Sequence, residues 1–192
     1  MSPQPPMGNG IDDRRTPRDL FDRRNAVHHF TLDAAASYEN TLVPSHYCTI
    51  NGTFVVGLDK PISEDGLSHS WAHSVVFFNP PYSQPEQPCR LHCQKKRCLV
   101  RGHLMRYSAG TEDFVAKAWL ETRTGCPLAE GLLPVRTEQP WFHRFVYDIE
   151  RGCWRPGVSV EFIPGRLKYD GLATGAPFPS MLVTWRPPPP QT

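Results

Sequence analysis

The feature that most limits how this chain can fold is a short apolar run that ends in two prolines. In residues 74–78 a serine is followed without a break by β-branched and aromatic side chains, which is typical of a buried strand. Pro80 and Pro81 cannot continue a central hydrogen-bonded ladder, so the strand has to stop before them. The run Asn79-Pro80-Pro81-Tyr82 is therefore predicted to form a stiff loop at the carboxyl end of a strand, the edge at which open α/β sheets bind ligands.

Such a loop suits methylation of an amino group attached to a flat ring. The lone pair of that nitrogen is delocalised into the ring, and hydrogen bonds from the NH₂ group to the Asn79 side-chain oxygen and the Pro80 carbonyl would return it to the nitrogen. Tyr82 is expected to stack on the flat face of the substrate, which requires an accessible ring and a cavity that joins Asn79 to Asp33. The alternative is a turn with no ligand, because 21 of the 192 residues are proline.

Composition and charge are those of an ordinary globular domain. The chain has a mass of 21.8 kDa, is 39% hydrophobic and 21% charged, and carries a formal net charge of +2, so overall charge does not announce a polyanionic partner. No run approaches 18 consecutive apolar residues, and the first 25 residues lack the apolar core of a signal peptide. We therefore expect an intracellular protein (the cytoplasm of a bacterial host, or the nucleus or cytoplasm of a eukaryote) without membrane contact, whose six cysteines are mostly reduced thiols.

Alternating strand and helix patterns predict an α/β doubly wound sheet, mostly parallel with a late antiparallel strand pair. Residues 1–13 are expected to be a disordered tail, 14–186 one domain, and 187–192 a proline-rich tail. The run 54–57 reads as a strand or as part of an insertion. The remaining expected elements are a helix from Pro17 to Asn25 with Thr16 as N-cap, a strand over 29–33 before a turn of small residues at 34–36, a helix capped by Thr111, a strand ending at Pro134, a helix around 141–146, and strands over 158–163 and 180–185.

The segment 83–110 fits no simple pattern. It holds six cations but no acid between Gln87 and Thr111, together with Cys89, Cys93, Cys98, His92 and His103. These residue types suit zinc, but the spacing Cys-x₃-Cys-x₄-Cys-x₄-His lacks the usual closely spaced pairs. We therefore favour a basic surface loop able to touch phosphates and assign no metal. An intervening sequence that is not native structure at all remains a third interpretation.

Two acidic residues are candidates for ligand contacts. Asp33 is expected at the sheet edge, where it is either a turn or cap residue or a ligand contact. Asp65 precedes Gly66, and Asp-Gly most often marks a turn.

Taken in order, the segments resemble the phage-type DNA N6-adenine methyltransferase family (Dam-like) over about residues 16–185. The resemblance rests on Thr16-Pro17, 30–36, Asp65-Gly66-Leu67 with Trp71, 78–82, 132–134 with Trp141-Phe142, 165–169 and 176–180. It implies a Rossmann-like methyltransferase sheet with helices on both faces, and transfer of a methyl group from S-adenosylmethionine to N6 of a flipped adenine in DNA.

The resemblance also implies roles for individual residues. By position, the cofactor would be bound by Thr16, Pro17, Asp33, Ala34, Ala35, Asp65 and Asn79. The catalytic loop would consist of Asn79, Pro80, Pro81 and Tyr82. The target DNA would be contacted by Tyr82, Gly165, Arg166 and Lys168, although Arg166 is equally well explained as a surface turn residue.

Two departures from the family pattern concern extra chain. The 28 residues from Ser83 to Gly110 are additional and lie directly after the catalytic loop, and there are signs of further extra residues around 53–61. A separate target-recognition domain is missing, so site specificity would come from short loops. The loop chemistry alone also fits methylation of an RNA adenine, cytosine N4 or a protein glutamine, and the basic segment alone fits a catalytically silent nucleic-acid-binding protein. No obligate protein partner is evident.

Overall fold

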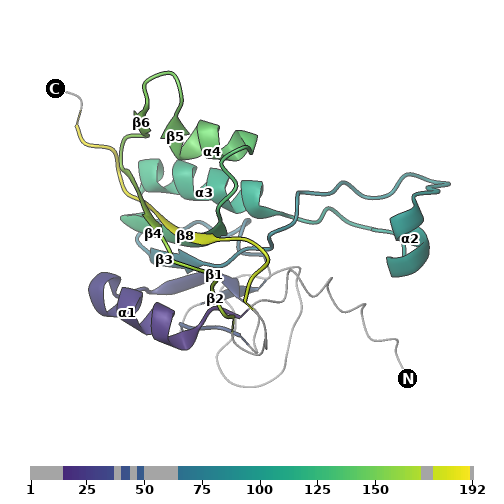
Figure 1. Cartoon of the computed structure of the whole chain (residues 1–192), viewed down its shortest axis with the longest axis horizontal. Coiled ribbons are helices and arrows are strands. Elements are labelled where there is room, and N and C mark those ends of the chain that lie inside the picture. The colour runs from purple at the N-terminus through teal and green to yellow at the C-terminus, as the bar shows by residue number, and fades with distance from the viewer. Residues whose placement is uncertain (1–14, 37–39, 44–46, 50–64, 170–174, 191–192) are drawn as a thin grey trace.

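A mixed six-stranded sheet forms the centre of the protein, with helices against it (Figure 1). The computed structural model describes residues 15–36, 40–43, 47–49, 65–169 and 175–190. The strands of the sheet lie in the order β2-β1-β3-β4-β8-β7, and β5 and β6 form a separate two-stranded hairpin. The strands are β1 Leu32–Ala36, β2 Tyr47–Thr49, β3 Val75–Phe78, β4 Leu128–Pro134, β5 Tyr147–Asp148, β6 Cys153–Trp154, β7 Val158–Phe162 and β8 Ser180–Trp185. The helices are α1 Arg18–His28, α2 Lys96–Arg101, α3 Thr111–Thr124 and α4 Pro140–Phe145.

Strand directions divide the sheet into two parts. The pairs β1–β2, β1–β3 and β3–β4 are parallel, whereas β8 runs antiparallel to both β4 and β7. The predicted α/β class and the late antiparallel pair are therefore confirmed. Parallel neighbours bring the carboxyl ends of β1, β3 and β4 to one edge of the sheet.

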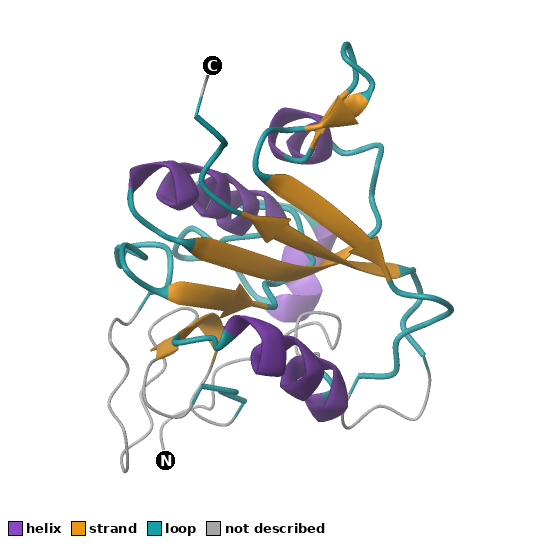
Figure 2. Ribbon diagram, turned by 90° about the vertical axis from the view of Figure 1, so that its left-hand side faces the viewer, coloured by secondary structure: helices purple, strands orange, loops and turns teal. Residues whose placement is uncertain are grey.

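Each face of the sheet is covered by helix, because successive strand residues point to opposite sides. Phe77 packs with Leu20 and Phe21 of α1 in one apolar cluster. Phe78 packs with Phe114 of α3 and with the aromatic residues of α4 in the other. Figure 2 shows α1 and α3 on opposite sides of the strands, so the expectation of helices on both faces is confirmed.

A buried ion pair attaches α1 to the middle of the sheet. Glu130 in β4 is fully buried and binds Arg24 of α1, with 2.9 Å between Arg24 Nε and Glu130 Oε1. The hydroxyl of Thr184 donates to the same carboxylate at 2.7 Å, and Arg24 also pairs with Glu161 of β7 at 3.0 Å. The hydrogen bond to Glu130 raises the pKa of Arg24, and the network positions α1 against three strands.

Several expected boundaries are wrong. α1 has Pro17, not Thr16, as its N-cap, and it continues to His28 instead of ending at Asn25. The first strand covers Leu32–Ala36, so Ala34, Ala35 and Ala36 are strand residues and not a turn. The predicted end of β4 and the predicted starts and ends of α4, β7 and β8 are confirmed to within a residue or two.

Some expectations fall outside the described residues: the run 54–57, the terminal segment 1–13 and the last two residues. Of the described helices, none is long and apolar enough to cross a membrane. The five cysteines whose side chains are described are free thiols.

Candidate active site

The loop Asn79–Tyr82 directly follows β3, as expected, and is held in place from both sides. Asn79 is half-buried, while Pro80, Pro81 and Tyr82 are buried. The Thr111 hydroxyl, at the start of α3, donates to the Pro81 carbonyl oxygen at 2.9 Å. Two prolines and this buried hydrogen bond leave the backbone little freedom. The loop therefore presents its amide side chain from a rigid support.

Tyr82 does not offer an open ring face in this structure. Its side chain is 3% exposed, and its hydroxyl donates to the Leu132 carbonyl oxygen at 3.1 Å. The same hydroxyl lies 2.7 Å from that of Tyr169, and the ring meets Phe178 edge-on at 5.5 Å between centroids. The expected accessibility of Tyr82 is thus wrong for this conformation, since two distant side chains and a carbonyl enclose the ring.

Asp33 is a buried acid in the strand next to this loop. Its side chain points to the same face as Phe77, with which it is in register, and it is 4% exposed. Its carboxylate accepts hydrogen bonds from the backbone N–H groups of Leu42 at 3.1 Å and Ala35 at 3.5 Å. Desolvation raises the pKa of Asp33 to about 7, against the smaller lowering effect of these two bonds.

Asp33 is a buried carboxylate with no cationic partner among the described residues. Within the described part of the chain, no Lys, Arg or His side chain forms an ion pair with Asp33. Burying a charge without a partner is costly, so such a group either keeps its proton or binds a positive ligand. Asp33 therefore fits a ligand that carries a positive group.

The β1–β3 register brings the two strand ends together. Leu32 pairs with Val76 and Asp33 with Phe77, so the same register continued for two residues sets Ala35 opposite Asn79. Ala34 and Ala35 are both buried and carry only a methyl group, which lets another group approach the backbone closely.

The other expected site residues differ in how exposed they are. Thr16 and Pro17 are buried just before α1, where the Pro17 carbonyl accepts from Phe21 N at 3.1 Å. Asp65 is exposed and closes its own turn, with its carboxylate accepting from Leu67 N at 2.9 Å. The turn prediction for Asp65 is therefore confirmed, and its ligand role stays a prediction.

The late Gly-Arg turn lies on the surface. Gly165 has a φ of +75° and open space around its Cα, a conformation that glycine adopts readily. Arg166 and Lys168 are exposed, and Tyr169, one residue further on, is the buried partner of Tyr82. The turn is thereby connected to the loop Asn79–Tyr82 through one tyrosine pair.

Three residues near the loop escaped the sequence reasoning. Thr111 was expected to cap α3, but Gly110 is the N-cap, and its backbone N–H donates to the Asp113 carboxylate, at 2.9 Å between Gly110 N and Asp113 Oδ2. Tyr169 holds the Tyr82 hydroxyl, and Arg136 lies 5.6 Å from the centroid of Phe178, next to Tyr82. None carries a local signal, since each acts across a long sequence separation.

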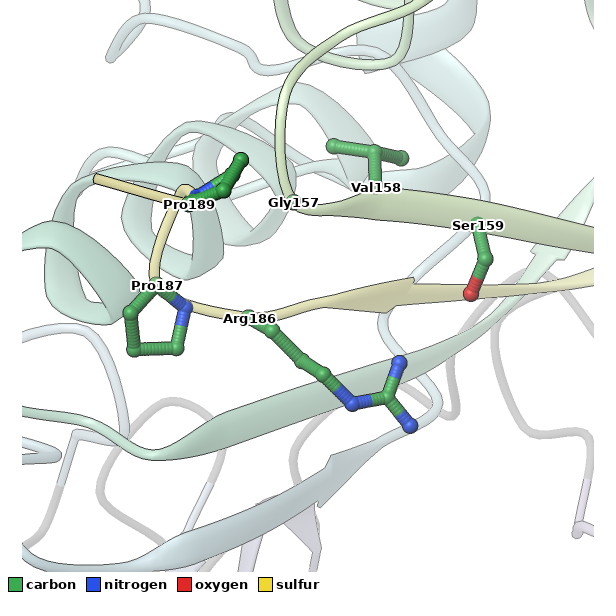
Figure 3. Close-up of a pocket in the computed structure, with 6 residues that line it drawn as sticks. All are labelled: Gly157, Val158, Ser159, Arg186, Pro187 and Pro189. Atoms are coloured by element: carbon green, nitrogen blue, oxygen red, sulfur yellow. The ribbon is translucent and has the colours of Figure 1, made fainter. Parts of the chain in front are cut away.

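A surface pocket elsewhere is not part of this site. Figure 3 shows it at the end of β8 and the start of β7, lined by Gly157, Val158, Ser159, Arg186, Pro187 and Pro189, with a volume of about 310 Å³. Trp185, the last residue of β8, pairs with Ala129 near the amino end of β4. The pocket is thus at the opposite edge of the sheet from Asn79.

Comparison with known families agrees with the resemblance seen in the motifs. No curated protein and no solved structure gives a significant match. A model of the family described as DNA N-6-adenine-methyltransferase (Dam) matches residues 8–191, nearly the whole chain. The protein therefore belongs to the Dam family of DNA N6-adenine methyltransferases.

Proposed function

We propose that Asn79, Pro80, Pro81 and Tyr82 form the loop that receives the target adenine of this DNA N6-adenine methyltransferase. The observation that carries the proposal is the position of the loop, directly after a buried parallel strand and beside Asp33 of the neighbouring strand. The chain passes from β1 to β2 on one side and returns to β3 on the other. Ligands bind at this kind of reversal in open α/β sheets, which supports a Rossmann-like methyltransferase arrangement.

The proposed chemistry is hydrogen bonding that activates N6. The Asn79 side-chain oxygen and the Pro80 carbonyl each accept a hydrogen bond from the N6 amino group and direct the nitrogen lone pair away from the ring. The braced backbone at Pro81 keeps these acceptors in a fixed geometry, and positioning of this kind lowers the barrier without a strong base. The proton leaves to water after the methyl group has been transferred.

Asp33 is the proposed partner of the cofactor's positive group. S-adenosylmethionine supplies an electrophilic methyl group when bound, and its methionine part carries an ammonium that matches a buried acid with no cationic partner in the described part of the chain. Ala34 and Ala35 permit close approach, and Thr16, Pro17 and Asp65 are proposed to complete the cofactor contacts. Burial of Asp33 with the backbone N–H groups of Leu42 and Ala35 as its hydrogen-bond partners supports this assignment.

The proposed stacking role of Tyr82 requires a conformational step. The ring must release the Leu132 carbonyl and the Tyr169 hydroxyl before it can lie on a flipped base. Extruding a base costs a few kcal/mol, and the movement of Tyr82 adds to that cost. Gly165, Arg166 and Lys168 remain proposed contacts to the target strand, and their exposure is compatible with this role.

The test is methyl transfer from labelled S-adenosylmethionine to unmethylated DNA, followed by digestion and detection of N6-methyladenine. Asn79→Ala should abolish transfer while leaving the thermal transition intact. Gln84→Ala is the matched control, because it removes an exposed amide just beyond the loop. Unchanged transfer in Asn79→Ala would refute the site assignment, and label in RNA, cytosine N4 or protein glutamine but not in DNA adenine would replace the substrate.

A further inference from the structure

The segment 83–110 forms an arm whose two ends are fastened together at the catalytic loop. The Thr111 N–H donates to the Ser83 carbonyl oxygen at 3.2 Å. Gly110 packs so closely that a Cβ atom there would lie 2.3 Å from the same oxygen. Figure 1 shows the arm projecting from the body of the protein, with α2 at its tip. The arm is therefore an appendage on an otherwise continuous domain.

The two sides of the arm pair as they leave the body. Glu86 and Ser108 form an antiparallel bridge, with N–O distances of 2.9 and 3.0 Å. Cys89 N then donates to the Leu104 carbonyl oxygen at 2.8 Å. This pairing delivers Cys89 and His103 to the same end of the arm, next to α2.

Four potential metal ligands meet at that end. The ligand atoms of Cys89, Cys93, Cys98 and His103 all lie within 4.8 Å of one another. The sulfur of Cys98 is 3.6 Å from those of both Cys89 and Cys93, far longer than the ~2.05 Å of a disulfide. In a tetrahedral zinc site with Zn–S bonds of ~2.3 Å, neighbouring sulfurs are about 3.8 Å apart. The observed spacing is that of a site ready for a tetrahedral ion.

We propose that Cys89, Cys93, Cys98 and His103 bind one structural Zn²⁺ that folds the tip of the arm. The four protein ligands complete a tetrahedron and leave no open position, which is the pattern of a structural and not a catalytic zinc. The backbone N–H of Leu104 donates to the Cys89 sulfur at 3.3 Å, and such outer bonds orient metal-bound thiolates. The sequence spacing argued against zinc, but the antiparallel pairing of the arm brings distant ligands together.

The tip has a physical need for a metal because it has almost no apolar core. Leu91, Leu99, Val100 and Met105 are between 77% and 92% exposed, whereas Cys98 is 3% exposed. A segment this short cannot bury enough apolar surface to order itself. Metal binding supplies the folding free energy in small domains of this kind.

The charge of the tip indicates what the folded arm contacts. Three thiolates, one neutral imidazole and Zn²⁺ carry a net charge of −1. The stretch 87–110 has no acid and contains six cations: Arg90, Lys95, Lys96, Arg97, Arg101 and Arg106. We infer, on the basis of the DNA substrate of the family, that this excess of cations binds DNA phosphates beside the catalytic loop. The zinc site itself depends only on the geometry of the arm.

Metal content of the purified full-length protein tests the zinc site. After dialysis against metal-free buffer, the protein should retain one zinc per chain, and Co²⁺ in its place should give the visible bands of tetrahedral cobalt–thiolate. Cys93→Ser and Cys98→Ser should lose both signals, whereas Cys153→Ser, an exposed thiol of the β5–β6 hairpin, should keep them. Absence of zinc after reconstitution with Zn²⁺, or equal loss in Cys153→Ser, would overturn the proposal whether or not the protein methylates DNA.

The salt dependence of DNA binding tests the contact. The double variant Lys95→Gln/Lys96→Gln should flatten the plot of log K against log salt by about 2, since each lost phosphate contact contributes about 0.9. Arg18→Gln/Arg23→Gln on α1 is the control with the same charge change. An unchanged slope in the arm variant would refute the DNA contact and leave the zinc site standing.

Discussion

Replacement of Asp33 by asparagine gives the sharpest prediction, because the burial of this acid sets both sign and size. The folded state keeps the proton up to about pH 7, whereas an unfolded chain releases it near pH 4. The folded protein therefore binds more protons over this interval, and the stability from this group is present at low pH and lost as pH rises through 7. From the linkage between protonation and folding, the free energy of unfolding should fall by roughly 3 kcal/mol between pH 5 and pH 8.

Urea unfolding from pH 5 to pH 8 measures this difference. The asparagine side chain has no charge to bury, so the stability of Asp33→Asn relative to the wild type should rise by roughly 3 kcal/mol across the range. The same replacement at Asp19, an exposed acid of α1, controls for the loss of one carboxylate. A stability difference that stays flat from pH 5 to pH 8 would refute the view of Asp33 as a desolvated acid.

The same carboxylate connects stability to cofactor binding. If the cofactor ammonium pairs with Asp33, binding requires the ionised form, and the affinity for S-adenosylmethionine should fall roughly tenfold from pH 7.0 to pH 5.5. Calorimetric titration at the two pH values measures this effect. Asp33→Asn should bind the cofactor weakly at both pH values, so this variant should be more stable but less able to bind the cofactor. Full cofactor affinity in the variant would remove Asp33 from the site.

Three other substitutions test how the sheet and the loop are held. Arg24→Ala leaves a fully buried carboxylate without its cation and should lower the free energy of unfolding by about 3–5 kcal/mol, against less than about 1 kcal/mol for Arg23→Ala on the surface, as denaturant titration would show. Gly131→Ala sets a methyl group 2.6 Å from the ring of Phe78 and should cost about 1–3 kcal/mol by the same measurement; a neutral result would mean that the ring has room to shift. Tyr82→Phe removes two hydrogen bonds but keeps the ring, so kcat should survive while Tyr82→Ala loses it; equal losses in methyl transfer would indicate that the hydroxyl, not the stacking face, is what matters.

Local chemistry made the central strands and the loop predictable. Phe77 and Phe78 lie in an unbroken apolar run, and Pro80 and Pro81 end it, so strand and loop could both be placed from the residues alone. The apolar spacing around Trp141 likewise predicted α4. These features depend on neighbours within a few positions, which a single sequence displays directly.

Long-range packing hid the rest. The small side chains of Ala34, Ala35 and Ala36 suggest a turn. These residues form a buried strand instead, because β1 pairs with β2 on one side and with β3 on the other. Tyr82 was expected to be open, but Tyr169, at a separation of 87 residues, closes it. Neither the strand at 34–36 nor the burial of Tyr82 can be predicted from residues nearby in the sequence.

The arm shows how a large addition can lie beside the proposed catalytic loop without displacing it. Because Ser83 and Thr111 meet in a hydrogen bond, the loop and α3 keep the geometry of a direct connection. Closing a loop of 28 residues costs about 3 kcal/mol, which is small beside the ~10–16 kcal/mol that zinc contributes in small zinc-binding domains. A chain in which residues 84–109 are removed and Ser83 is joined to Gly110 should therefore fold and bind S-adenosylmethionine, while its DNA affinity falls; failure of that shortened protein to fold would show that the arm belongs to the domain itself.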